Sequence, residues 1–249
     1  MRYEAHTEVM GEYRIRIVSD EDPQNPRTDC DGHAGKMICW HNRYNLGDKE
    51  KEYDDIEEFQ HVAEKEGFFV LPLYLYDHSG ITMSTGAFSC PWDSGQVGFI
   101  YCKPFDALEY FGIKIDLAAI PDNPDVSLDD YRDLGKTAQA RVDASYKRYR
   151  KFYLKLLGKE NVEILLSHMK GEVETYDHYL TGNVYGYIVE EKIPYEKKNL
   201  KTNEVEQIDE WEEVDSCWGF YGDYEKGALE EARSIVKHLM EKETEKEIA

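Results

Sequence analysis

Apolar residues recur in short runs along the first hundred positions, and glycine-bearing turns separate these runs. The most apolar run extends from Phe68 to Tyr76, so we expect a strand that is buried on both faces. Pro72 within it cannot donate a hydrogen bond to a neighbouring strand, which predicts a bulge or an unpaired edge. The other runs and alternations predict strands within residues 8–19, 36–41, 81–86, 90–102, 183–193 and 205–214.

Apolar residues at a spacing of three to four positions predict helices between these strands. Asp54 and Asp55 precede the first helix, where negative charge suits the helix dipole, and Gly67 ends it. Ser127 begins the longest helix and Gly158 ends it. The expected helices cover residues 54–67, 104–111, 127–158, 161–180 and 224–242.

Strands first, helices in the middle and strands again are typical of the α+β class. We expect a mainly antiparallel sheet with helices on one face and a long central helix. One domain over residues 1–249 is expected, because the strands after residue 183 need a sheet to join. The alternative is a division at the proline-bearing connector into a β-rich part, 1–113, and a helical part with returning strands, 127–249.

Charge is the strongest global feature of the chain. Acidic residues number 51 and basic residues 30, for a formal net charge of −21. The simplest interpretation is solubility through self-repulsion. The sharper interpretation is that the acidic surface imitates nucleic acid and binds a basic surface of another protein. Direct binding of DNA or RNA is not expected, because it requires a cationic surface.

Acidic runs supply the residues that we expect to contact such a partner. Trp211 stands amid acids and is the tryptophan that we expect to be exposed, whereas the other tryptophans are expected in the core. The expected contact residues are Asp54, Asp55, Glu57, Glu58, Asp129, Asp130, Asp209, Glu210, Trp211, Glu212 and Glu213.

The compartment follows from what the chain does not contain. No apolar run is long enough to cross a membrane, and the first residues lack the apolar core of a signal peptide. Five cysteines without regular spacing do not suggest a disulfide framework. These features predict a cytoplasmic protein without a membrane partner, and they leave the oligomeric state open.

Four segments carry a family resemblance: CWHNRYNLGD from Cys39, LPLYLYDHSGITMST from Leu71, CPWDSGQVGFIY from Cys90 and DSCWGFYGD from Asp215. Together they resemble a family of uncharacterised proteins carried by bacteriophages and mobile elements. The resemblance implies a phage or mobile-element origin and a location in the host cytoplasm. It favours a role in host takeover or counter-defence, and it implies no activity and no catalytic residues.

The turn-rich segment from Asp20 to His41 contains candidate metal ligands. Carboxylates of Asp20, Asp22 and Asp31 suit Mg²⁺ or Ca²⁺, whereas His33 with neighbouring cysteines suits zinc. The spacing matches neither a calcium loop nor a zinc finger, and a solvated loop with side-chain-capped turns is the alternative. We therefore predict no required cofactor and retain a divalent metal at this segment as an alternative.

A second constellation suits covalent catalysis. Cys90 is a candidate nucleophile and His78 its base, with Asp93 or Asp77 to orient the imidazole, provided that strands 71–76 and 96–102 pair. The alternative is a small buried cysteine that packs under Trp92. A metal- or Cys-dependent hydrolase is therefore one rival function.

Sequestration of a small molecule, such as a nucleotide, is another rival function. Its pocket would be lined by Arg43, Asp48, His78, Trp92 and Trp218. The chain contains no phosphate-binding loop, dinucleotide fingerprint or nucleophile elbow. The sequence therefore favours an acidic protein that binds and inhibits a host nucleic-acid-handling protein, and leans away from an enzyme.

Overall fold

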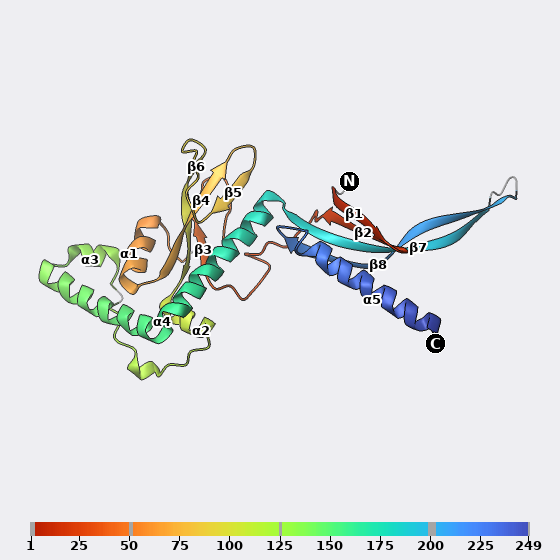
Figure 1. The fold of residues 1–249 in the computed structure, drawn as a ribbon. Helices are drawn as coiled ribbons and strands as arrows, with labels where there is room; N and C mark the ends of the chain where they lie inside the picture. Colours follow the sequence, from red (N-terminus) through yellow and green to blue (C-terminus); the bar gives the residue numbers. More distant parts are fainter. Residues whose placement is uncertain (1–2, 50–51, 125, 199–202, 249) are drawn as a thin grey trace. The chain divides into compact units, whose positions relative to one another are not determined.

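The computed structural model describes residues 3–49, 52–124, 126–198 and 203–248 (Figure 1). The chain divides into two compact units: unit 1 contains Met1–Gln24 and His178–Ala249, and unit 2 contains Asn25–Asp177. The chain is therefore divided after Gln24 and after Asp177, and not at the proline-bearing connector. Both units combine antiparallel sheets with helices, which confirms the α+β class. Among the described residues, no helix is long and apolar enough to cross a membrane.

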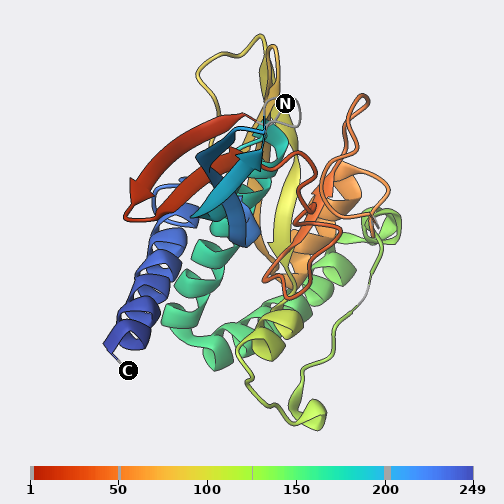
Figure 2. The ribbon, with the colours of Figure 1, turned by 90° about the vertical axis from the view of Figure 1, so that its right-hand side faces the viewer.

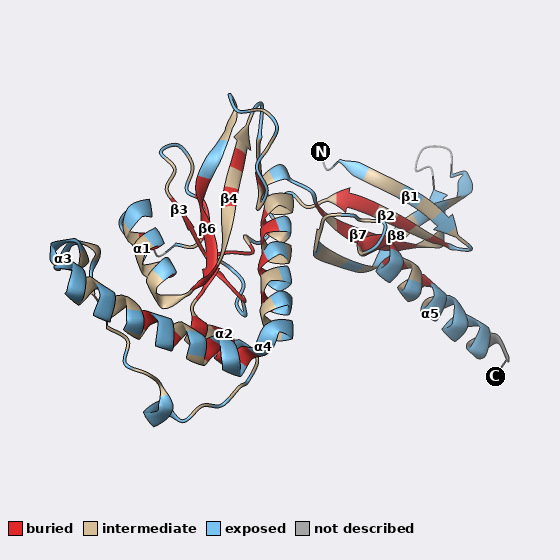
Figure 3. Cartoon of the chain, turned by 60° about the vertical axis from the view of Figure 1, so that its left-hand side comes forward, coloured by how far each residue is buried: buried red, intermediate tan, exposed pale blue. Residues whose placement is uncertain are grey.

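Unit 1 is an antiparallel sheet with one helix packed on it. The strand order is β1-β2-β7-β8, and the elements are β1 (Glu4–Met10), β2 (Tyr13–Ser19), β7 (Val184–Lys198), β8 (Val205–Tyr221) and α5 (Ala228–Ile248). Alternate residues of β2 and β7, such as Ile15 and Val189, pack with Ala232 and Val236 of α5 in one buried cluster. Figures 2 and 3 show α5 beside the strands of this sheet. This buried cluster is the core of the unit.

Unit 2 is built on a second antiparallel sheet with the order β3-β6-β4-β5. Its strands are β3 (Lys36–Cys39), β4 (Phe69–Asp77), β5 (Ile81–Ser84) and β6 (Ser94–Cys102). Its helices are α1 (Ile56–Glu66), α2 (Pro104–Tyr110), α3 (Leu128–Asp133) and α4 (Lys136–Thr181), with a short 3₁₀ helix at Leu117–Ala119. The last residues of α4 belong to unit 1.

Helices cover both faces of the unit 2 sheet. Phe59 of α1 packs against Phe99 and Tyr101 on one face. On the other face, Ile100 of β6 and Met169 of α4 both lie next to Gly35. A Cβ atom at Gly35 would lie 2.8 Å from the Ile100 side chain and 3.1 Å from that of Met169. Adjacent residues of β6 therefore point to opposite helices. The expectation of helices on a single face holds for unit 1.

Several predicted elements are confirmed, and the caps explain why. The Asp55 side chain accepts from the amide of Glu58 at the start of α1, and Gly67 ends that helix in the left-handed conformation. β4 and β6 pair along their length, as the two apolar runs predicted. The register shifts between Leu73 and Tyr74, directly after the position of Pro72.

Two predicted boundaries are wrong for a local reason. The strand expected within residues 8–19 is two strands, because Gly11 adopts φ 63° and reverses the chain between Met10 and Tyr13. The helix expected to begin at Ser127 ends at Asp133, and α4 begins only at Lys136. Gly158, with φ 74° and ψ 164°, then interrupts α4 where we expected a helix end.

Candidate functional site

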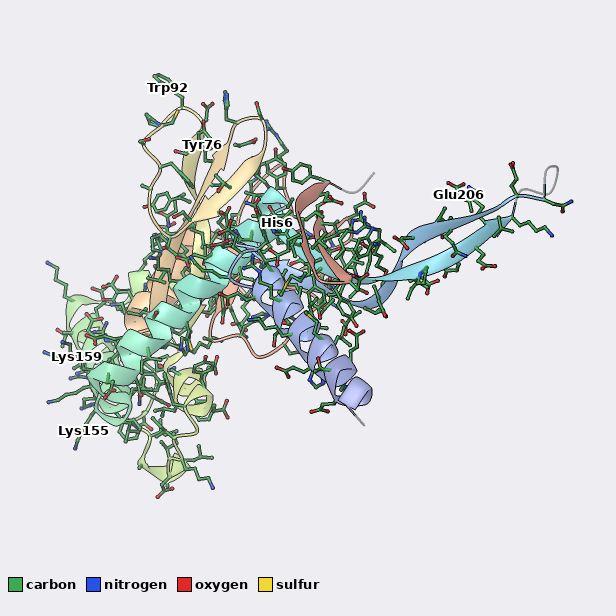
Figure 4. All side chains as sticks on the ribbon, turned by 45° about the vertical axis from the view of Figure 1, so that its right-hand side comes forward. His6, Tyr76, Trp92, Lys155, Lys159 and Glu206 are labelled. Atoms are coloured by element: carbon green, nitrogen blue, oxygen red, sulfur yellow. The ribbon has the colours of Figure 1, made fainter. Side chains whose placement is uncertain are left out.

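The ends of β4 and β6 carry a hollow of about 460 Å³ in unit 2. Its wall includes His41, Arg43, Asp77, Trp92 and Asp93. Trp92 lies in the loop between β5 and β6 (Figure 4), and 92% of it is exposed. The expectation that this indole packs in the core, with Cys90 beneath it, is therefore wrong.

Asp93 brings the predicted catalytic residues together. Its Oδ2 lies 3.5 Å from Nδ1 of His78 and accepts a hydrogen bond from Sγ of Cys90 at 3.5 Å. The backbone of Asp93 is held by β4, because its carbonyl accepts from the amide of Asp77 at 2.8 Å. The thiol hydrogen bond thus goes to the carboxylate, whereas a thiol activated for attack donates to an imidazole.

Arg43 and Asp77 form an ion pair on the wall of the hollow. Nη1 of Arg43 lies 2.8 Å from Oδ2 of Asp77, whose other oxygen accepts from the Tyr44 hydroxyl at 3.1 Å. Nδ1 of His41 accepts from the amides of Arg43 and Tyr44, so its ring proton lies on Nε2. These bonds fix the 41–44 loop beside the strand ends.

Two of the predicted pocket residues lie elsewhere. Asp48 binds the buried guanidinium of Arg27 and accepts from the Met37 amide at 3.0 Å, so its role is in the interior of unit 2. Trp218 belongs to β8 in unit 1, where its ring covers Gly186. Arg43, Trp92 and, through Asp93, His78 are the predicted pocket residues that the structure brings together.

The predicted metal ligands divide between the units. Asp20 and Asp22 belong to unit 1, and Asp20 caps the backbone amide of Asp22 at 3.1 Å. Asp31 and His33 belong to unit 2, and the His33 ring hydrogen-bonds the Cys30 carbonyl at 3.0 Å. Over the described parts of the chain, no group of three or more His, Cys, Asp or Glu suits a metal ion. A divalent metal stays a prediction.

The acidic residues around α1 and α3 form one local group. Asp54, Asp55, Glu57 and Glu58 surround the start of α1, and Asp129 and Asp130 occupy the first turn of α3. Arg132 joins the two helices, since it pairs with Glu57 and lies 3.7 Å from Asp129. Asp55, Glu58 and Asp130 also take part in helix capping. Much of this group therefore has a structural role.

The acidic residues of β8 have a different setting, on a ribbon that extends past β2. β2 pairs with β7 only as far as Tyr13 opposite Glu191, whereas β7 and β8 stay paired out to Lys198 opposite Val205. Figure 1 shows these two strands continuing beyond β1 and β2. We call residues 192–198 and 203–213 the β7–β8 ribbon.

Glutamates oppose each other at the base of this ribbon. Glu190 stands directly opposite Glu213, and Glu191 directly opposite Glu212. Glu190 is compensated, because Arg14 lies 2.6 Å and Arg16 3.5 Å from its carboxylate. Like charges directly opposite in an antiparallel pair destabilise the sheet. The pair of Glu191 and Glu212 at the base of the ribbon is therefore a charge arrangement that folding of the sheet does not favour.

The two faces of the ribbon differ. On one face Tyr195 stands opposite Ile208, and Ile193 lies two residues along; all three are half-buried. On the other face the Arg14 guanidinium lies 4.7 Å above the Trp211 ring, and Lys192 pairs with Asp209 at 2.7 Å. Trp211 is therefore partly covered, and the expectation that it is the exposed tryptophan is wrong.

Sequence reasoning missed Arg27 altogether, and it did not place His41 or Asp77 in the wall of the hollow, although it named Asp77 as a residue that could orient the His78 imidazole. Arg27 gives little local signal, because its partners lie 21 and 145 residues away in the chain. The place of Asp77 in the wall could have been found, since it ends β4 and the antiparallel neighbour β6 begins at Ser94.

Comparison with protein-family models, with curated proteins and with solved structures finds no match to this chain.

Proposed function

We propose that this chain is an inhibitory binding protein that docks the β7–β8 ribbon on a basic, nucleic-acid-handling surface of a host protein. The paired glutamates at the base of the ribbon support this function most directly. Stability would improve if one member of the pair between Glu191 and Glu212 were neutral, so the pair points to selection for binding. The net charge of −21 acts in the same direction.

The ribbon also offers anchors for such an interface. One face of the ribbon supplies apolar area through Ile193, Tyr195 and Ile208. On the same face, Glu210 stands directly opposite Ile193, and Glu206 lies two residues from Ile208 along β8. Figure 4 shows Glu206 on the ribbon. Interfaces of this kind draw most of their affinity from a few buried aromatic or aliphatic side chains. The surrounding carboxylates would speed association and make it sensitive to salt.

The host setting of the proposal comes from the resemblance of four sequence segments to proteins of bacteriophages and mobile elements. A protein of that kind gains from blocking a host defence enzyme that acts on nucleic acid. Occupation of the enzyme's cationic groove by the ribbon would exclude DNA or RNA, because both would compete for the same lysine and arginine side chains.

The proposal is tested with the triple variant Glu206→Gln, Glu210→Gln, Glu212→Gln. Wild type and variant are immobilised, and proteins retained from a bacterial host lysate at low salt are identified and purified. The purified partner is then assayed for nucleic-acid binding with and without the chain. We expect wild type to block nucleic-acid binding and the triple variant to lose at least tenfold in potency.

The matched control neutralises three acids of the α1 and α3 group, with Asp54→Asn, Asp129→Asn and Glu57→Gln. It removes the same charge from unit 2 and should leave inhibition within about twofold of wild type. Equal loss in both variants would mean that total charge, and not the ribbon, determines binding. Failure to recover any basic, nucleic-acid-binding protein would count against the function itself.

A Cys-dependent hydrolase is the second candidate. The convergence of His78 and Cys90 on Asp93 favours it, and the adjoining hollow could admit a substrate.

A further inference from the structure

Trp92 is the most exposed of the large apolar side chains in the described part of the chain. Its exposed fraction is 92%, compared with 70% for Tyr3 and 68% for Leu117. Transfer of an indole out of water is strongly favourable, and tryptophan is enriched at the centres of binding interfaces. In Figure 4 the side chain lies at the outer end of the β5–β6 loop. A partner that covers Trp92 would gain the whole of this area.

The charges beside Trp92 indicate what kind of group fits there. Arg43 is neutralised by Asp77 at 2.8 Å, and the Tyr44 hydroxyl holds the second oxygen of that carboxylate. Asp93 instead contacts a thiol and an imidazole, each at 3.5 Å. Of the Asp, Glu, Lys and Arg side chains in the wall, two carboxylates stand against one guanidinium, so the carboxylate of Asp93 is a negative charge in excess.

We propose that this hollow binds an arginine side chain of a partner protein. A guanidinium can lie over the Trp92 indole and donate to the Asp93 carboxylate. Both interactions favour arginine: its planar fork matches a carboxylate, and it stacks on an aromatic face. The hollow of about 460 Å³ has room for one such side chain together with water.

This site is independent of the ribbon, since it lies in unit 2 and the ribbon in unit 1. It also differs from a nucleotide pocket built on the same residues. A phosphate would have to approach the carboxylates of Asp93 and Asp77, which would repel it. The charge of Arg43 would not offset this repulsion, because Arg43 is already paired with Asp77. The charge balance therefore selects a cation over an anion.

The test is a titration of the full chain with N-acetyl-arginine methylamide, followed through the indole N–H resonance of Trp92. Trp92→Phe assigns that resonance. We expect a saturable shift with the arginine compound and none with its uncharged citrulline counterpart. Asp93→Asn should weaken binding about tenfold, because one charge-assisted hydrogen bond is lost. Asp129→Asn removes an equally negative but distant side chain and should leave the affinity unchanged.

Three results would overturn the proposal. The first is an indole resonance that does not respond, or that responds equally to citrulline. The second is equal weakening by Asp129→Asn and Asp93→Asn, which would indicate general attraction to an acidic protein. The third is tighter binding of guanosine monophosphate than of the arginine compound, which would make the hollow an anion site. The wild-type titration decides the matter even if a variant fails to fold.

Discussion

Arg27 donates two hydrogen bonds to the carboxylate of Asp48, from Nε at 2.8 Å and from Nη2 at 3.1 Å. The same guanidinium donates to Glu172 at 2.8 Å and to the Gly35 carbonyl at 2.8 Å. Its side chain is 1% exposed. One buried cation thus ties the 25–35 loop, the 43–49 loop and α4 together inside unit 2.

Replacement of Arg27 by Met should destabilise the protein by about 3–5 kcal/mol, because two partly buried carboxylates lose their counter-charge. Urea denaturation measures the loss. Arg148→Met, at an exposed position of α4, is the control and should change stability by less than about 0.5 kcal/mol. A loss below about 1 kcal/mol for the Arg27 variant would show that the network is not needed.

Glu52 should make stability depend on pH in the acid range. Burial alone would raise its pKa, but hydrogen bonds from Lys103 and Lys36 lower the pKa to about 2. A group with a depressed pKa stabilises the fold above its unfolded pKa, near 4.5, and that contribution is lost as pH falls toward 2. Glu52→Gln should therefore flatten the stability profile between these values. Parallel profiles for the variant and wild type would contradict this assignment.

Gly98 should tolerate no side chain. A Cβ at this position would lie 2.0 Å from the carbonyl oxygen of Ile38, so β3 would have to separate from β6. Gly98→Ala should cost about 1–3 kcal/mol in thermal or urea unfolding. Gly95→Ala in the same strand is the matched control, because its Cβ would meet nothing within 4 Å. Similar behaviour of the two variants would contradict the close approach.

Glu212→Lys should separate stability from function. It replaces a like-charge pair with an attractive pair across from Glu191, so stability should rise by about 0.2–1 kcal/mol. Inhibition of the partner should fall at the same time if the ribbon is the docking element. A variant that is more stable and equally inhibitory would remove the main support for the ribbon.

Thiol reactivity should distinguish a catalytic Cys90 from a structural one. Cys30 is exposed, Cys90 is half-buried, and Cys39 and Cys102 are buried, with burial raising the pKa of the Cys102 thiol to about 12. Alkylation followed by peptide mass spectrometry should label Cys30 first, then Cys90, and Cys102 only after unfolding. Labelling of Cys90 ahead of Cys30 would favour the hydrolase.

The sequence alone determined the features that depend on neighbours in the chain. The caps at Asp55 and Gly67 delimited α1, and alternating apolar runs identified β4 and β6 and their pairing. That pairing also correctly placed His78, Cys90 and Asp93 near one another. Composition gave the negative charge, but not which carboxylates are occupied in caps and ion pairs.

Tertiary structure decided what depends on contacts across the chain. Asp48 lies outside the predicted pocket because it pairs with Arg27, which lies beside it only after folding. Trp211 is partly covered because Arg14 of β2 lies over its ring, whereas Trp92 is exposed. The ribbon exists because β2 is shorter than β7, a difference that no residue of β7 or β8 encodes. Local patterns fix local conformation, whereas exposure and charge pairing are set by residues that are distant in sequence.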